Sequence, residues 1–206
     1  MVTPAPARLE GLYVLIPVRR FSEAKTRLAG ALAPEARAAL ARALFVHVTH
    51  AIDESAAFAG VLVATDGDDV AEVARERGAQ VLRDESPQAL GCVIDRGLAH
   101  LASAGASGAL VLMADLPLLA ASDLRAAHAA MARSDVVIAP DAEERGTSAL
   151  GLRLPAAFPT HFGMWDSFER HRASAERRGL AFTVLRRQGL ARDVDTPEVL
   201  EALRWT

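Results

Sequence analysis

Short continuous runs of apolar residues alternate along this chain with longer segments in which apolar residues recur at helical spacing. The runs at 12–18 (LYVLIPV) and 108–113 (GALVLM) are apolar at almost every position, as strands buried on both faces of a parallel sheet are. The segment that begins at Pro34 carries an apolar residue at every fourth position from Leu40 to Ile52. That spacing is typical of a helix with one buried face. The pattern therefore predicts an α/β fold.

The same two signals divide most of the chain into expected elements. Strands are expected at 12–18, 61–65, 81–82, 108–113, 135–139, 149–154 and 182–185. Helices are expected from Pro34, from the turn at 66–69 to about Arg77, from the Ser86-Pro87 cap to Ser103, from Asp123 to Ala132, from Asp166 to Arg178 and from Pro197 to Arg204. Because strands and helices alternate strictly as far as residue 139, we expect a mostly parallel central sheet with helices on both faces. No repeat or linker interrupts the chain, so we expect a single domain over residues 1–206.

Composition argues against several classes of protein. The chain has 206 residues and a formal net charge of -3 without a block of like charge, which argues against a nucleic-acid partner. No apolar run approaches the roughly 18 residues of a membrane helix, and no signal-type stretch opens the chain, so we expect a cytoplasmic protein without a membrane partner. The single cysteine, Cys92, excludes an internal disulfide framework and a cysteine-based zinc cluster. We expect Cys92 to pack inside an apolar helix.

Four cations stand directly after the first expected strand. Arg19, Arg20, Lys25 and Arg27 fall within nine consecutive positions, and Lys25 is the only lysine among 23 Lys and Arg residues. Ligands of an open parallel sheet bind outside the carboxyl ends of the strands, so these cations are placed to face a polyphosphate. A solvated surface loop has the same composition, and this alternative stays open. The segment lacks the GxxxxGK and GxGxxG patterns of two common phosphate sites.

Aspartates follow the fourth expected strand and recur near the end of the chain. Asp115 comes directly after the most apolar strand, where a carboxylate is costly unless it is paired or binds a metal. Asp193 and Asp195 would lie on one side of an extended segment. Either motif could instead be a turn or a helix cap. Together with the cations, carboxylates suit Mg²⁺ and a bound phosphate, which points to phosphoryl or nucleotidyl transfer.

Several segments match a known family in order and spacing. They are IPVRR at 16–20, AKTRL at 24–28, MADLP at 113–117, IAPD at 138–141, GTSAL at 146–150, FG at 162–163, SFERH at 167–171 and DVDTPE at 193–198. Together they resemble the 2-phospho-L-lactate guanylyltransferases. The resemblance implies a glycosyltransferase-A-like nucleotidyltransferase fold, of the modified Rossmann type. It implies transfer of GMP from GTP to the phosphate of a small phosphorylated carboxylic acid, with release of pyrophosphate, in coenzyme F-420 biosynthesis. Family acceptors include 2-phospho-L-lactate, phosphoenolpyruvate and 3-phospho-D-glycerate.

The resemblance also implies roles for residues at the matching positions. Lys25, Asp115 and Asp195 would be catalytic. The nucleotide would contact Arg19, Arg20, Lys25, Thr65, Asp66 and Ala114, and the acceptor would contact Thr147, Gly163 and Ser167. Asp115 and Asp195 would hold Mg²⁺, with Asp193 next in line. His171 would border the acceptor pocket.

The chain departs from the family at three places, one of which is Arg19, where the family has lysine. ALG at 89–91 stands where the family has Gly-Leu-Asn, which removes an amide contact. FGMWDSF at 162–168 is one residue longer than the family's segment. We expect the longer loop to widen the acceptor pocket, so that phosphate on C3 is accepted as well as on C2, with Asp166 capping the next helix. Trp165 is a candidate for a lid or for a homodimer contact.

Two other classes of protein stay open. One is a different nucleotidyltransferase of this fold, such as a molybdenum-cofactor guanylyl- or cytidylyltransferase, although the chain lacks a Gly-rich LxxGxGxR-type opening. The other is a non-catalytic nucleotide-binding protein, although Lys25, Asp115 and Asp195 are all present.

Overall fold

The computed structural model describes residues 9–83, 89–195 and 199–201. The strands are β1 (Leu12–Pro17), β2 (Gly60–Thr65), β3 (Gln80–Arg83), β4 (Gly108–Leu112), β5 (Val136–Pro140), β6 (Thr147–Arg153) and β7 (Phe182–Val184). The helices are α1 (Pro34–Ser55), α2 (Asp68–Glu76), α3 (Leu90–Ala104), α4 (Ala121–Met131), α5 (Ser167–Glu176) and the short α6 (Gln188–Ala191). Two 3-10 turns, Phe21–Glu23 and Thr26–Leu28, lie between β1 and α1.

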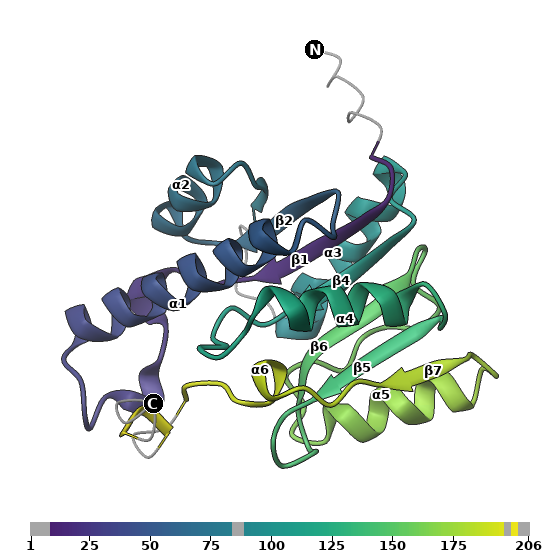
Figure 1. Ribbon diagram of the computed structural model, residues 1–206. Helices are drawn as coiled ribbons and strands as arrows, with labels where there is room; N and C mark the ends of the chain where they lie inside the picture. Colours follow the sequence, from purple (N-terminus) through teal and green to yellow (C-terminus); the bar gives the residue numbers. More distant parts are fainter. Residues whose placement is uncertain (1–8, 84–88, 196–198, 202–206) are drawn as a thin grey trace.

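The strands form one seven-stranded sheet in the order β3-β2-β1-β4-β6-β5-β7 (Figure 1). All pairs that do not involve β6 are parallel, and β6 runs antiparallel to both β4 and β5. The predicted mostly parallel sheet is therefore confirmed. The direction of β6 follows from its connection to β5, because the segment 141–146 is too short for a parallel crossover. Asp141 holds this turn with its carboxylate, which accepts the backbone N–H groups of Arg145 at 2.9 Å and Gly146 at 2.7 Å.

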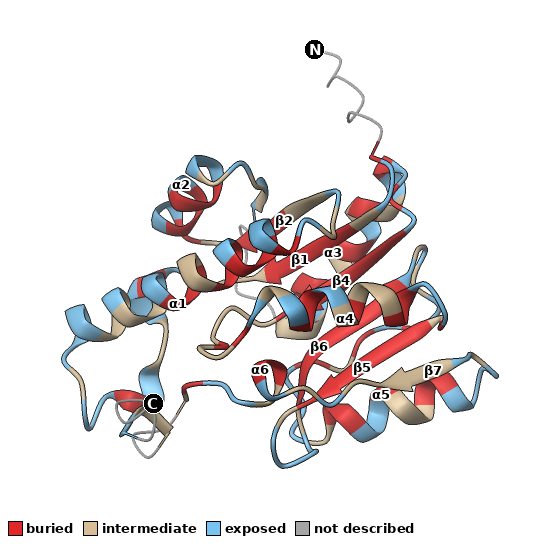
Figure 2. Ribbon diagram, viewed as in Figure 1, coloured by how far each residue is buried: buried red, intermediate tan, exposed pale blue. Residues whose placement is uncertain are grey.

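Helices cover both faces of the sheet, as the sequence predicts (Figures 1 and 2). Alternate side chains of each strand point to opposite faces, so Val14 and Ile16 of β1 lie in one core and Leu15 in the other. The first core is closed by residues of α1, α2 and α4, and the second by residues of α3 and α5. The strands that pass through both cores are buried, whereas the outer sides of α1 and α4 are exposed (Figure 2).

Some predictions about helices differ from the structure or lie outside the described residues. α4 begins at Ala121, and Asp123 lies in its first turn, where its carboxylate accepts the N–H of Ala120 at 3.1 Å. The predicted cap at Ser86-Pro87 lies outside the described residues, as does most of the predicted helix from Pro197 to Arg204. The prediction that Cys92 packs inside its helix is wrong, since Cys92 is exposed. The apolar content of α3 concealed this, because Val93 and Ile94 take the buried positions of that turn.

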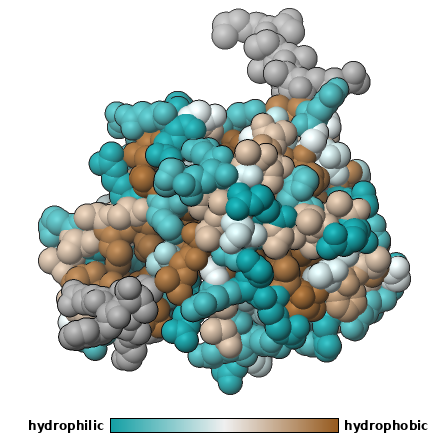
Figure 3. Space-filling view, in the orientation of Figure 1, coloured by the Kyte–Doolittle hydropathy of each residue, from teal (hydrophilic) through white to brown (hydrophobic). Residues whose placement is uncertain are grey.

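The surface of the described part carries both polar and apolar residues. On the face shown in Figure 3, hydrophobic areas are separated by hydrophilic ones. The large hydrophobic side chains that stay exposed are Met164 and Trp165, which are 50% and 77% exposed. No helix among the described residues is long and apolar enough to span a membrane.

Candidate active site

The carboxyl ends of the parallel strands bring distant segments to one edge of the sheet. β1 leads into the basic segment 19–27, β2 into Asp66, and β4 into Asp115. The C-terminal segment returns to the same edge after α6 (Figure 1). Its Val194 is buried and donates its backbone N–H to the carbonyl of Asp115 at 3.2 Å. This bond sets the Asp193–Asp195 pair beside the end of β4.

Lys25 is the buried cation of this edge. Its side chain is 6% exposed, and its Nζ donates to Asp115 Oδ2 at 2.5 Å and to Asp195 Oδ1 at 2.9 Å. Burial by itself lowers the pKa of Lys25, but the Asp115 and Asp195 carboxylates outweigh burial and raise its pKa, so the ammonium is charged. Lys25 also has a φ of 56°, in the left-handed region that costs a non-glycine residue roughly 1 kcal/mol or more. The two ion pairs hold the residue in this conformation.

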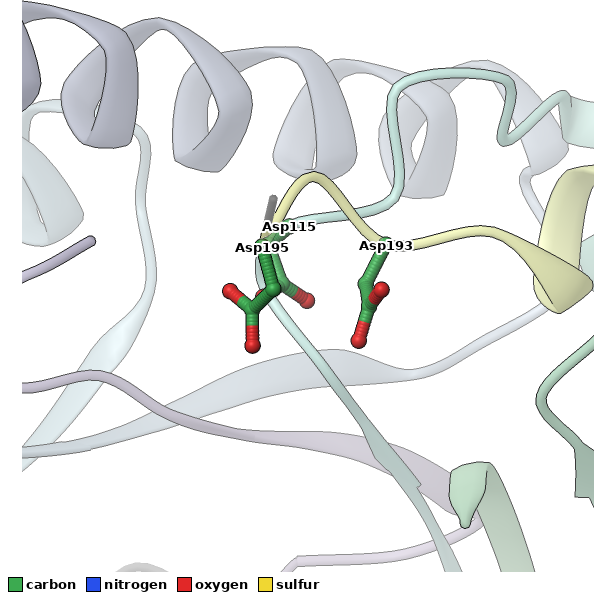
Figure 4. A group of neighbouring side chains, drawn as sticks. All are labelled: Asp115, Asp193 and Asp195. Atoms are coloured by element: carbon green, nitrogen blue, oxygen red, sulfur yellow. The ribbon is translucent and has the colours of Figure 1, made fainter. Parts of the chain in front are cut away.

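Three carboxylates meet around this cation. One oxygen each from Asp115, Asp193 and Asp195 lies within 4.8 Å of the others. Figure 4 shows the side chains of the three aspartates pointing the same way from two neighbouring segments. Desolvation of the carboxyl group raises the pKa of Asp193 to about 6, and the charges of Asp115 and Asp195 act in the same direction. Asp193 as a whole residue is exposed, but its carboxyl group lies beside the other two aspartates. An oxygen-only donor set with excess negative charge fits a hard divalent cation.

Three predicted nucleotide contacts lie at the β1–β2 side of this edge. Arg20 donates from its backbone N–H to Asp66 Oδ1 at 3.0 Å and from its guanidinium to Asp66 Oδ2 at 3.2 and 3.3 Å. Arg20 and Asp66 line a cavity of about 280 Å³ with Ser22 and residues 67–69. Thr65 is buried, and its hydroxyl accepts the N–H of Gly67 at 3.1 Å, so its side chain supports the turn.

Two further predicted nucleotide contacts flank the edge. Arg19 is exposed directly after β1, and Ala114 is half-buried directly before Asp115. The unexpected neighbour is Arg27, whose exposed guanidinium lies 3.3 Å from Asp195 Oδ2. Residues so far apart in the sequence leave no local pattern from which their pairing could be predicted.

Two of the three predicted acceptor residues are in contact. Ser167 Oγ donates to Thr147 Oγ1 at 3.2 Å, and both residues are buried. Thr147 opens β6 next to the end of β4, because Met113 donates its N–H to the carbonyl of Ser148 at 3.0 Å. Gly163 lies in the connection to α5 with a φ of 87°. Thr147 and Ser167 therefore lie at the same edge of the sheet as Asp115.

His171 joins these hydroxyls as a buried, hydrogen-bonded side chain. Its ring is fully buried, with Nδ1 3.0 Å from Thr147 Oγ1 and Nε2 accepting the backbone N–H of His161 at 2.8 Å. Burial, together with the smaller effect of the neighbouring His161, lowers the pKa of His171 to about 3. The available sequence signal was the four-residue spacing of Ser167 and His171, which places both on one side of a helix.

The segment before α5 differs from its predicted role. Asp166 takes the N-cap position of α5, but its carboxylate makes no cap hydrogen bond and instead accepts from Arg170 Nε at 2.6 Å. The predicted cap is therefore wrong, because the salt bridge within the first turn takes the carboxylate. Gly91 of α3 packs against the same segment, since a Cβ there would lie 3.3 Å from the carbonyl oxygen of Phe162. The missing side chain at Gly91 thus allows α3 to approach the acceptor loop.

The burial of a neutral imidazole makes stability depend on pH. The unfolded chain takes up a proton at His171 below its ordinary pKa of 6.5, whereas the folded chain does so only near pH 3. The free energy of unfolding should therefore decrease as the pH is lowered, by about 2 kcal/mol from pH 7 to pH 5 from this group alone. His171→Asn should lose this contribution, as urea denaturation at both pH values would measure. His50→Asn, at an exposed position of α1, is the control. Equal pH dependence in His171→Asn and the parent would contradict the assignment.

Comparison with known proteins agrees with the sequence resemblance. A family model described as "Guanylyl transferase CofC like" matches residues 12–204. The phosphoenolpyruvate guanylyltransferase of Sphaerobacter thermophilus is 38% identical over 193 residues, which cover 92% of this chain and 90% of the relative. The 3-phospho-D-glycerate guanylyltransferase of Phenylobacterium zucineum is 34% identical over 187 residues, covering 89% of this chain and 85% of the relative. The 2-phospho-L-lactate guanylyltransferase of Methanothermobacter thermautotrophicus is 34% identical over 186 residues, covering 90% and 81%.

Solved structures share the fold at low sequence identity. A nucleotidyl transferase from Methanothermobacter has a TM-score of 0.62 at 15% identity and covers 94% of this chain and 95% of its own. A CMP:2-keto-3-deoxy-manno-octonic acid synthetase has a TM-score of 0.60 at 17% identity, covering 94% and 97%. The predicted nucleotidyltransferase fold is thereby confirmed. The family match and the relatives make the protein an enzyme of the nucleotidyltransferase class. The chain belongs to the guanylyl transferase CofC-like family.

Proposed function

We propose that this protein transfers GMP from GTP to the phosphate of a small phosphorylated carboxylic acid, with release of pyrophosphate, in coenzyme F-420 biosynthesis. The observation that carries the proposal is the buried Lys25 between Asp115 and Asp195, in a chain whose family match runs over residues 12–204. The three named relatives act on phosphoenolpyruvate, 3-phospho-D-glycerate or 2-phospho-L-lactate, all of them phosphorylated carboxylic acids. The acceptor class follows from this shared chemistry.

The reaction needs charge neutralisation more than proton transfer. An oxygen of the acceptor phosphate attacks the α-phosphorus of GTP, the bond between the α- and β-phosphates breaks, and pyrophosphate leaves with the electron pair. The acceptor is an anion at neutral pH, so no general base is required. The protein must offset the repulsion between two anions and stabilise the charge on pyrophosphate. Lys25 supplies a buried positive charge for this, and Arg19 and Arg20 add exposed ones at the same edge.

The three aspartates would hold the divalent cation that such a reaction uses. Asp115 and Asp195 lie beside the buried end of β4, and Asp193 adds a third carboxylate. We assign them to Mg²⁺, which prefers carboxylate oxygens and keeps positions for substrate phosphates. When bound, the ion would neutralise phosphate charge.

The acceptor side of the proposed site is built by hydroxyl groups and a glycine. Thr147 at the start of β6 and Ser167 at the start of α5 carry the hydroxyls, and Gly163 lies in the loop before α5. We assign the carboxylate or phosphate of the acceptor to these groups. The longer loop at 162–168 supports an acceptor pocket that admits phosphate on C3 as well as on C2. A cytoplasmic location and a homodimer belong to the same proposal.

A substrate panel tests the activity. Incubation of the protein with GTP, Mg²⁺ and an equimolar mixture of 2-phospho-L-lactate, phosphoenolpyruvate and 3-phospho-D-glycerate should release pyrophosphate and yield guanylylated acids that mass spectrometry resolves. We expect 3-phospho-D-glycerate among the acceptors used. Use of 2-phospho-L-lactate alone would contradict the proposed wider acceptor pocket but would agree with the proposed guanylyl transfer. Use of none of the three acids would contradict the proposed function.

The same assay separates the two other classes of protein. A molybdenum-cofactor type of nucleotidyltransferase would leave all three acids unused, and a cytidylyltransferase would require CTP in place of GTP. A non-catalytic nucleotide-binding protein would release no pyrophosphate with any acid. The family match and the buried lysine between two aspartates favour the first proposal over both.

A further inference from the structure

A chain of hydrogen bonds runs from the backbone of His161 through His171 to Thr147. The N–H of His161 points at His171 Nε2 at 2.8 Å, so this nitrogen accepts and carries no proton. A neutral imidazole then has its proton on Nδ1, which lies 3.0 Å from Thr147 Oγ1. His171 therefore donates to Thr147. A protonated ring would direct a second N–H against the N–H of His161, so this arrangement admits only the neutral form.

The Thr147 hydroxyl receives two hydrogen bonds and has its own proton left. Its oxygen accepts from His171 Nδ1 and from Ser167 Oγ, which together use both lone pairs. Within the described part of the chain, no group accepts the Thr147 proton in return. A buried hydroxyl whose lone pairs are both taken can only act as a donor. A bound anion is the natural partner for that donor.

The position of Thr147 puts this donor at the proposed site. Thr147 is the first residue of β6, and the adjacent Ser148 pairs with Met113 at the end of β4. Asp115 follows two residues later, so the donor and the carboxylates share one edge of the sheet. Ser167 and His171 reach Thr147 from the same side of α5, one helical turn apart.

We propose that His171 is a positioning residue for the acceptor, in that it fixes the Thr147 hydroxyl as a hydrogen-bond donor to an anionic oxygen of the phosphorylated acid. The proposal rests on the proposed function for the identity of the acceptor. It assigns His171 no contact with the substrate. Its effect passes through one hydroxyl group, so it should act on acceptor binding and leave the use of GTP unchanged.

Two variants of similar size separate donation to Thr147 from burial alone. In His171→Asn the side-chain amide nitrogen takes the place of Nδ1 and keeps the donor. In His171→Gln the amide oxygen takes the place of Nε2, which keeps the acceptor for the N–H of His161 and removes the donor. We expect His171→Gln to raise the acceptor KM about 10-fold or more, the range for a hydrogen bond to a charged group. His171→Asn should stay within about 3-fold of the parent, and the GTP KM should change little in either variant. His50→Gln is the surface control.

A double-mutant cycle tests whether the effect passes through Thr147. Thr147→Val keeps the shape of the side chain and removes the hydroxyl, so it should raise the acceptor KM on its own. In this background His171→Gln should add no further loss, because the group on which His171 acts is gone. A further loss of the same size in the Thr147→Val background would show a purely structural role and overturn the proposal.

A measurement on the parent protein tests the proposal even if the variants do not fold. Nitrogen-15 NMR of the histidine side chains should show His171 as the Nδ1–H tautomer, and its shifts should move on addition of the phosphorylated acid but not of GTP. An Nε2–H tautomer would overturn the proposal. If the parent enzyme uses a phosphorylated acid while His171→Asn and His171→Gln have equal acceptor KM values, the inference alone fails. If the parent uses none of the acids, the proposed function fails as well.

Discussion

Asp115→Asn should reduce kcat/KM for guanylyl transfer by about 10³-fold with little change in folding. Asp115 is the carboxylate common to both features of the site: it bonds Lys25 and lies within 4.8 Å of the oxygens of Asp193 and Asp195. The amide keeps the size of the side chain and removes the charge on which a divalent cation depends. Lys25 keeps its bond to Asp195, so the buried ammonium is not left without a partner.

Pyrophosphate release at saturating GTP measures this loss, and a Mg²⁺ titration shows whether higher metal concentration restores part of it. Asp53→Asn is a matched control, because Asp53 is exposed near the C-terminal end of α1. The control should retain the parent's kcat/KM. A value for Asp115→Asn within about 3-fold of the parent would exclude Asp115 from the chemistry.

Lys25→Met should lower kcat by about 10²-fold or more, while the affinity for the divalent cation does not fall. Methionine keeps the length and apolar packing of the side chain, which is 6% exposed, and removes the positive charge. Lys25 now occupies one oxygen of Asp115 and one of Asp195, so a cation that uses those oxygens competes with the ammonium. Without the ammonium, both carboxylates are free to bind the metal ion. The phosphates of the substrate, however, lose their buried positive charge.

Calorimetric titration with Mn²⁺ or Mg²⁺, together with pyrophosphate release, separates the two effects. Arg133→Met is the matched control, because Arg133 is exposed directly after α4. Lys25→Arg should not rescue activity, since a planar guanidinium does not fit the place of a compact ammonium between two carboxylates. Unchanged kcat in Lys25→Met would remove the lysine from the site.

Much of the fold could be predicted from sequence because its signals are local. A continuous apolar run such as LYVLIPV has one stable environment, a strand buried on both faces, and it forms β1. The rule that ligands bind at the carboxyl ends of parallel strands then points to Lys25 and Asp115 from sequence alone. Alternation along an extended segment placed Asp193 and Asp195 together, and the burial of Val194 between them agrees with it.

The features that sequence could not predict depend on long-range contacts. Lys25 adopts a left-handed backbone conformation that its own residue type disfavours, because Asp115 and Asp195 hold its ammonium from positions 90 and 170 residues away. The bond between Arg27 and Asp195 has the same origin. The Asp166 carboxylate could accept either from the helix backbone, as a cap, or from a nearby cation. Arg170 lies one turn later and takes the carboxylate into a salt bridge.

The sequence by itself determined the alternation of strands and helices, the edge at which the charged residues gather, and the residue types that meet there. These follow from hydrophobic periodicity and from the common direction of parallel strands, which need only neighbouring residues. The tertiary structure alone decided that Lys25 bonds both aspartates and that His171 pairs with Thr147. The choice of hydrogen-bond partner is made within a few tenths of an ångström by packing from several elements, and no spacing along the chain contains that information.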